Sequence, residues 1–264
     1  MTRVLSGAVL VGIVGAAVIW APSWVLLGMA AVVAVLAMRE FAALADRAGA
    51  PVPAAVSGIA ALALCVAAAL AGSSSALVVA AVVLVQSVMA VGASRPAAGT
   101  LPAVAAAVFG PLYVGLPLGW LVAVHAAWGA AATLLLIGVV ALSDTAQYYG
   151  GRFAGRRPLA PVISPKKTIE GAVAGVVAAP IALVAAGTRL WPEASPVLLI
   201  ALGVAIALLG IAGDLFESLM KRSVGVKDSS ALIPGHGGVL DRIDALLFAA
   251  PVYYAVLPYA IRPA

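Results

Sequence analysis

The 264-residue chain is 64% hydrophobic and only 9% charged, whereas an ordinary soluble domain is roughly one quarter charged. This composition excludes a water-soluble domain with a normal polar surface. The formal net charge is +5, and in a membrane protein an excess of Lys and Arg first reports orientation rather than nucleic-acid binding. We therefore expect an integral membrane protein.

Apolar runs long enough to cross about 30 Å of hydrocarbon as helices recur along most of the chain. They are rich in Ala, Val, Leu and Gly and lack the ten-residue apolar and polar alternation of a β-barrel. The predicted fold class is all-α, a polytopic helix bundle that forms a single transmembrane domain over residues 1–264, with its active site in 131–264. Nine spans are predicted, at about 4–21, 24–39, 54–72, 76–92, 102–125, 128–147, 169–188, 195–220 and 243–260.

Three details qualify this pattern. The fifth span contains "FGPLYVGLPLGW", in which Pro111 and Pro117 predict a kink or break. Residues 2–21 have the length of a signal peptide, but no clear cleavage site precedes "WAPSW", so we expect the segment to remain. Cys65 lies inside an apolar run, which favours a buried thiol over a redox or metal role.

Lys and Arg are distributed unevenly between the two sides of the predicted bundle. With alternating spans, thirteen of the fifteen fall on the side of the N-terminus, and only Arg189 and Arg262 fall on the other. The positive-inside rule makes the rich side cytoplasmic and places the C-terminus outside. The two long polar connections, roughly 148–168 and 221–242, are then cytoplasmic, and we expect the chemistry there.

A polar face lies on the helix that leads into the second connection. Its residues, spaced i, i+3, i+4 and i+7, are Asp214, Glu217, Ser218 and Lys221. An ionisable residue at membrane depth costs about 2.5–3.5 kcal/mol on insertion scales, so such a face predicts a functional role. The alternative of a snorkelling helix end would explain Lys221 and Arg222 but not Asp214.

Basic and acidic residues alternate beyond Arg222. They are Lys227, Asp228, Asp241, Arg242 and Asp244. Carboxylates hold a hard cation such as Mg²⁺ and basic side chains neutralise phosphate oxygens, so the alternation predicts a site for metal and polyphosphate. Gly237 and Gly238 leave backbone N–H groups accessible to a phosphate. His236 has no Cys or second His nearby, which favours a phosphate or structural role over zinc.

The first connection, "SDTAQYYGGRFAGRRPLAPVISPKKTIEG", has similar chemistry. Asp144 is expected to close the sixth span, and Thr168 to cap the seventh, where a helix N-terminus favours anions. The basic residues between them are Arg152, Arg156, Arg157, Lys166 and Lys167. The alternative for the arginines is an anchor for lipid headgroups.

The stretch "SLMKRSVGVKDSSALIPGHGGVLDRID" closely resembles the signature of phosphatidate cytidylyltransferases, also called CDP-diacylglycerol synthases. The segment Ser143–Gly171 is similar to the upstream loop of the same family, so the resemblance covers about residues 140–245. The first 100 residues match only as a hydrophobic region. Every fixed position of the signature is filled, by Ser218, Lys221, Arg222, Lys227, Asp228, Ser230, Ile233, Pro234, His236, Gly237, Gly238, Asp241, Arg242 and Asp244.

The resemblance implies Mg²⁺-dependent transfer of the cytidylyl group of CTP to phosphatidic acid, giving CDP-diacylglycerol and pyrophosphate. We expect the metal ligands to be Asp214, Asp241 and Asp244, with Asp144 and Asp228 next, and a second cation is left open. The expected catalytic residues are Asp144, Asp214, Lys221, Arg222, Lys227, Asp228, His236, Asp241, Arg242 and Asp244. The expected substrate-binding residues are Ser164, Lys166, Lys167, Thr168, Ser218, Gly237 and Gly238.

Two alternatives stay open at this point. One is a cytidylyltransferase for another membrane lipid phosphate, because the signature reads phosphates more than acyl chains. The other is a transporter, although its charges should lie near the membrane midplane rather than in glycine-bearing loops at one interface. We expect CTP, phosphatidic acid and membrane lipids as partners and no nucleic acid, and a homodimer is left open.

Overall fold

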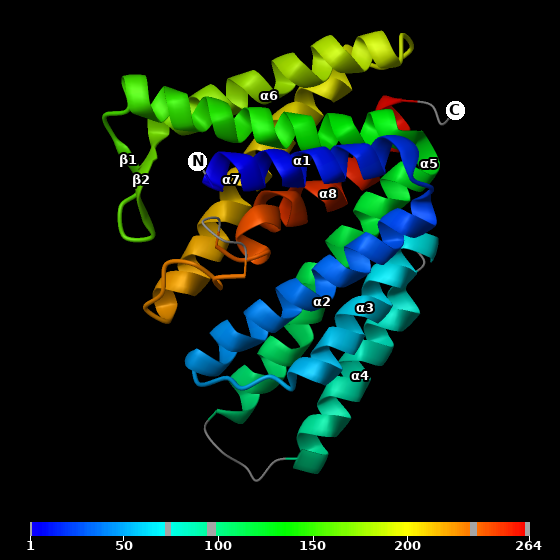
Figure 1. Cartoon of the computed structure of the whole chain (residues 1–264), viewed down its shortest axis with the longest axis vertical. Coiled ribbons are helices and arrows are strands. Elements are labelled where there is room, and N and C mark those ends of the chain that lie inside the picture. Colours follow the sequence, from blue (N-terminus) through cyan, green and yellow to red (C-terminus); the bar gives the residue numbers. More distant parts are fainter. Residues whose placement is uncertain (1, 72–74, 94–98, 233–236, 262–264) are drawn as a thin grey trace. The chain divides into compact units, whose positions relative to one another are not determined.

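The computed structural model describes residues 2–71, 75–93, 99–232 and 237–261. Within these ranges the chain is helical apart from one short β-hairpin, so the predicted all-α fold class is confirmed. The elements (Figure 1) are α1 (Thr2–Trp20), α2 (Ser23–Arg47), α3 (Ala54–Ala71), α4 (Ala76–Ala93), α5 (Thr100–Ala154), β1 (Pro158–Ala160), β2 (Ser164–Thr168), α6 (Ile169–Leu190), α7 (Pro196–Ser223) and α8 (Leu240–Ala260).

Every predicted span overlaps one of these helices. In the described part of the chain, six helices are long and apolar enough to cross a membrane, namely α2, α3, α5, α6, α7 and α8. Shorter apolar helices cover Val11–Trp20 and Ala76–Gly92. The count of nine spans therefore stays a prediction, as does the single transmembrane domain.

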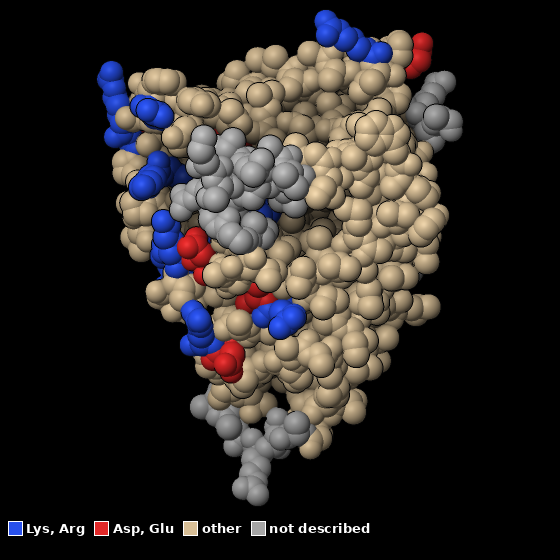
Figure 2. Space-filling model, viewed as in Figure 1, with Lys and Arg blue, Asp and Glu red and all other residues tan. Residues whose placement is uncertain are grey.

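Much of the described surface is apolar, as lipid contact requires. Leu70, Leu77 and Val91 are among the large apolar side chains that are at least three quarters exposed. Figure 2 shows broad areas of one face without Lys, Arg, Asp or Glu. Exposed apolar surface on this scale is typical of a region that contacts hydrocarbon rather than water.

Helix α5 contains two of the predicted spans, and its backbone is interrupted close to the predicted boundary between them. The backbone stays helical through Pro111 and Pro117 and leaves helical geometry at Gly129, where φ is 75° and ψ is −172°. A break at the prolines is therefore wrong, whereas the interruption at Gly129 lies next to the predicted boundary between the fifth and sixth spans. A proline removes one N–H donor, which a packed helix bundle tolerates, whereas a residue without Cβ adopts positive φ at little cost.

Helix α5 extends beyond the predicted sixth span. It continues past Asp144 to Ala154, so the first connection begins after residue 154 rather than at about 148. Packing against α6 explains the extension: a Cβ on Gly150 would lie 2.5 Å from the Cβ of Ala174. The absence of a side chain at Gly150 allows α5 and α6 to approach closely, so tertiary packing outweighs the low helix propensity of glycine.

A hairpin that the sequence did not predict follows α5. Strands β1 and β2 pair antiparallel, with Pro158 opposite Thr168 and Ala160 opposite Ser164. Thr168 is the N-cap of α6, and its hydroxyl accepts a hydrogen bond from the backbone N–H of Gly171 at 3.1 Å. The predicted N-cap is confirmed.

The described chain divides into two compact units. The first consists of Met1–Ala123 with Ser223–Arg242. In it, α2 packs on α3 and α3 on α4, and a Cβ on Gly119 would collide with the carbonyl oxygen of Cys65. Close approach at small residues is how helices associate in lipid. Cys65 is fully buried and free, as predicted.

The second unit consists of Val124–Arg222 with Ile243–Ala264. It contains the second part of α5, the hairpin, α6, α7 and most of α8. A Cβ on Gly213 would lie 2.5 Å from the carbonyl oxygen of Asp244, so the backbones of α7 and α8 touch there. This close approach sets the position of the polar face of α7 relative to α8.

Candidate functional site

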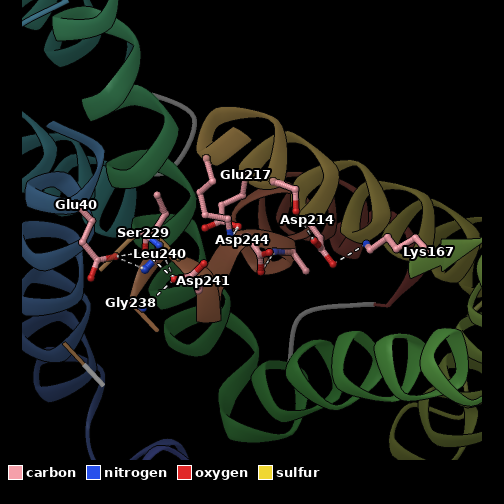
Figure 3. Close-up of polar contacts among 12 residues, drawn as sticks. Glu40, Lys167, Asp214, Glu217, Ser229, Gly238, Leu240, Asp241 and Asp244 are labelled. Carbon is pink, nitrogen blue, oxygen red and sulfur yellow. Dashed lines mark hydrogen bonds and ion pairs between the residues drawn. The ribbon is translucent and has the colours of Figure 1, made fainter. Parts of the chain in front are cut away.

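The polar face of α7 meets the end of the hairpin in the second unit. Lys167 of β2 forms an ion pair with Asp214, with 2.5 Å between Nζ and Oδ2 (Figure 3). The other oxygen of Asp214, Oδ1, lies 3.4 Å from the Ser218 hydroxyl, one turn further along α7. The side chains of Lys167 and Asp214 are 21% and 37% exposed, so the pair lies where a dissolved anion can reach it.

Two further carboxylates belong to the same neighbourhood. Asp244 of α8 lies beside Asp214 (Figure 3), because Gly213 brings the two helices into contact. Asp244 interacts electrostatically with Asp214 and Asp144, and Asp144 interacts with Asp214 and Lys167. Asp144, Asp214 and Asp244, here called the three-helix carboxylate group, thus come from α5, α7 and α8 of one unit.

A buried ion pair follows on α7. Lys221 pairs with Glu217 one turn earlier, and their side chains are 10% and 2% exposed. The ammonium group of Lys221, one of the expected catalytic residues, is thus largely buried beside a carboxylate. Because an isolated buried charge is very costly, each member of this pair stabilises the other.

Asp241 organises the connection between α7 and α8 in the first unit. Its Oδ2 accepts hydrogen bonds from the Gly238 N–H at 2.8 Å, the Ser229 N–H at 3.0 Å and the Ser229 hydroxyl at 2.7 Å. Gly237 has a φ of 79°, and a Cβ there would lie 2.8 Å from the same oxygen. Glycine is therefore required at this position by both backbone conformation and space.

Glu40 of α2 holds the same connection and was missed by the sequence analysis. It is 6% exposed. Oε1 accepts the Ser230 hydroxyl at 2.6 Å and the Val239 N–H at 2.9 Å. Oε2 accepts the Ser229 hydroxyl at 2.9 Å and the Leu240 N–H at 2.8 Å. A buried carboxylate with four donors is a strongly specified feature of the fold.

The amino-acid sequence matches the cytidylyltransferase family over residues 1–260. The chain belongs to this family. It is 42% identical over 156 residues to the uncharacterized protein YnbB of Escherichia coli, covering 53% of this chain and 52% of the relative. It is 41% identical over 148 residues to a phosphatidate cytidylyltransferase of Helicobacter pylori, covering 55% and 54%. It is 45% identical over 135 residues to the chloroplastic phosphatidate cytidylyltransferase 5 of Arabidopsis thaliana, covering 50% of this chain and 33% of the relative.

The chain thus spans about half the length, or less, of these curated relatives. Family membership and the apolar helices together identify a multi-pass membrane protein. They do not favour the transporter alternative.

The remaining predicted residues differ in burial. Ser164 begins β2 and is half-buried, whereas Asp228 and four basic residues are exposed, namely Lys166, Arg222, Lys227 and Arg242. His236 lies outside the described residues. Among the residues that are described, no group of three or more His, Cys, Asp or Glu side chains is arranged to hold a metal by itself.

Glu170 is a second residue that sequence reasoning missed. It accepts the backbone N–H groups of Arg156 and Arg157 at 3.0 and 3.1 Å, and the Arg157 Nε at 2.9 Å. It therefore fixes the start of the hairpin to the first turn of α6. A local signal existed, because an acidic residue two positions after an N-cap is favoured by the helix dipole.

Proposed function

We propose that this protein transfers the cytidylyl group of CTP to phosphatidic acid, forming CDP-diacylglycerol and pyrophosphate. The family membership and the relatives named phosphatidate cytidylyltransferase support the proposal. The observation that carries it is the ion pair of Lys167 with Asp214 beside Asp244. It joins basic and acidic groups from separate segments in one partly exposed place, as a reaction between two anionic substrates requires.

The proposed reaction needs no nucleophile from the protein. A phosphate oxygen of phosphatidic acid attacks the α-phosphorus of CTP, and the bond between that phosphorus and the oxygen bridging to the β-phosphorus breaks. Pyrophosphate leaves with the bonding electrons. Because a phosphate monoester is largely dianionic at neutral pH, no general base is required. The protein contributes charge neutralisation and in-line positioning.

Lys166 and Lys167 are the basic groups that we assign first to the phosphates. They stand at the end of β2, directly before the Thr168 cap of α6. Anions are favoured at a helix N-terminus, where backbone N–H groups lack intrahelical partners. Lys167 is held by Asp214, so its ammonium group is oriented before substrate arrives.

Mg²⁺ is part of the proposal, and the three-helix carboxylate group fits it. Mg²⁺ usually binds through one or two carboxylates together with substrate phosphates, rather than in a cage made by protein alone. Asp214 and Asp244 are the residues that we expect to hold it, and Asp144 interacts electrostatically with both. Asp241 and Asp228, also expected as ligands, lie in or directly after the connection between α7 and α8, and their role stays a prediction. When bound, the ion neutralises negative charge on the phosphates.

We further propose that the site faces the cytoplasm, with the N-terminus inside and the C-terminus outside. CTP is a cytosolic solute, whereas the acyl chains of phosphatidic acid stay in the bilayer. The asymmetry of Lys and Arg supports this orientation.

The orientation is testable because Cys65 is the only cysteine and is buried. In a Cys65→Ala background, Val162→Cys places a thiol on the hairpin before α6, where Val162 is 88% exposed. Glu193→Cys places one in the exposed connection after α6. A membrane-impermeant maleimide should label position 193 in intact cells and position 162 only in inverted vesicles. The reverse pattern contradicts the orientation.

The activity is tested with purified protein in lipid nanodiscs supplied with CTP, Mg²⁺ and phosphatidic acid. We expect stoichiometric pyrophosphate and CDP-diacylglycerol, measured by coupled assay and mass spectrometry. Reaction only with another lipid phosphate would show that the lipid is wrongly assigned. Failure to bind CTP would contradict the proposal as a whole.

A further inference from the structure

We propose that Glu40 is a positioning residue for nucleotide binding, acting through the connection between α7 and α8. The inference rests on the proposed function, because it assigns a role within that reaction. Glu40 belongs to the N-terminal region, which carries none of the family signature. All the contacts that support the inference lie within the first unit.

The donors to Glu40 come in two pairs from the two ends of one loop. Ser229 and Ser230 precede the segment 231–238, and Val239 and Leu240 follow it. One carboxylate thus joins both ends of the segment that contains Gly237 and Gly238. Ordering a loop costs conformational entropy, and a carboxylate that holds both of its ends offsets part of that cost.

Four donors lie within hydrogen-bonding distance of the Glu40 carboxylate, at 2.6–2.9 Å, and an ionised carboxylate has about four lone-pair sites. One of the four donors, the Ser229 hydroxyl, is shared with Asp241. Two of these donors, the N–H groups of Val239 and Leu240, stand at the start of α8, where N–H groups have no intrahelical partner. Glu40 therefore occupies the place that an anion would take at this helix end.

This occupancy has a consequence for substrate binding. The phosphates of the nucleotide cannot bind the N–H groups of Val239 and Leu240, because Glu40 already accepts their hydrogen bonds. The function of Glu40 is instead to hold the loop, on which the side chain of Lys227 is exposed, in one conformation. Glu40 touches no reacting atom in this role.

Glu40 and Asp241 share the Ser229 hydroxyl as a hydrogen-bond donor. Ser229 Oγ lies 2.9 Å from Glu40 Oε2 and 2.7 Å from Asp241 Oδ2, and its single proton goes to one of them at a time. A Cβ on Gly238 would collide with Ser229 Oγ, and it would lie 2.4 Å from Glu40 Oε2 and 2.6 Å from Glu40 Cδ. The absence of a side chain at Gly238 is what lets α2 reach the loop.

The test compares Glu40→Gln, which keeps the shape and removes the charge, with Glu40→Asp, which keeps the charge on a shorter stem. Asp46→Asn is the matched control, because Asp46 is exposed on the same helix. Hydrogen exchange by mass spectrometry reports on peptides covering 224–240, with hairpin peptides 155–168 as internal reference. Steady-state kinetics give kcat and KM for CTP, and thermal unfolding reports on the fold.

For Glu40→Gln we expect about tenfold faster exchange at residues 229–240 and a KM for CTP raised about tenfold, as for loss of hydrogen bonds to a charged group. Glu40→Asp should recover part of both effects, and Asp46→Asn should show neither. If Glu40→Gln does not fold, Ser230→Ala removes one donor from Glu40 and should give smaller shifts in the same direction.

Unchanged exchange and an unchanged KM in folded Glu40→Gln would overturn the inference. Faster exchange with an unchanged KM would also overturn it, because Glu40 would then have only a structural role. The proposed function fails separately: if the wild-type protein neither binds nor consumes CTP, that proposal is wrong, while hydrogen exchange still tests whether Glu40 holds the loop.

Discussion

Asp241 and Asp244 stand three positions apart at the start of α8, yet their surroundings differ. Asp241 has one oxygen that accepts three hydrogen bonds from the connection between α7 and α8. Asp244 accepts a hydrogen bond from the next residue of its own helix, at 2.8 Å, and lies beside Asp214. The comparison shows that two carboxylates whose spacing predicts one role have different partners: Asp241 organises a loop, whereas Asp244 lies beside Asp214. The metal-binding role of each stays a prediction.

The largest effect is expected at Asp244. We expect Asp244→Asn to lower kcat about 1,000-fold, the scale of losing an electrostatic group at a reacting centre, with the unfolding temperature little changed. The Mg²⁺ concentration needed for half-maximal activity should also rise. Turnover near that of wild type would remove Asp244 from the proposed metal site.

A smaller effect is expected at Asp241. Asp241→Asn weakens the acceptor of the Ser229 and Gly238 N–H groups, so we expect kcat/KM to fall about 100-fold, corresponding to a few kcal/mol of lost charged hydrogen bonding. Hydrogen exchange of residues 229–238 should become faster in this variant and stay unchanged in Asp244→Asn. If both variants show the same exchange, the distinction between the two carboxylates is wrong.

The smallest effect is expected at Lys167, which forms the ion pair with Asp214 beside Asp244. Lys167→Met removes the partner of Asp214, and we expect a KM for CTP raised about tenfold, the scale of one charged contact. Lys166→Met is the matched comparison, because Lys166 is exposed next to it in β2 and should cost less. An equal effect of both substitutions would mean that bulk positive charge, rather than the pair with Asp214, matters.

Part of the fold could be predicted because its signals are local. Hydrophobic length located the helices, and the i, i+3 and i+4 spacing placed Asp214 and Ser218 on one face, where they now interact. The Thr168 cap was predictable because its donor, the Gly171 N–H, is three residues away. Each of these features is complete within a few turns of chain.

Other features could not be predicted because they depend on contacts between helices. The extension of α5 to Ala154 depends on the fit of Gly150 against α6. The burial of Lys221 depends on which side of α7 faces the interior. Glu40 left only a weak signal: it and Asp46 are the two acidic residues before Asp144, and an ionisable residue at the end of a membrane span suggests a function.

The sequence by itself determined the class of protein, the helical membrane fold and the residues that carry charge, because hydrophobicity, periodicity and a filled signature are properties of short segments. Only the tertiary structure decided that a carboxylate 190 residues before Ser230 holds the signature loop, and that Asp241 and Asp244 have different partners. Those choices depend on helix faces that meet only after folding, where small residues allow backbones to approach and buried charges must find donors.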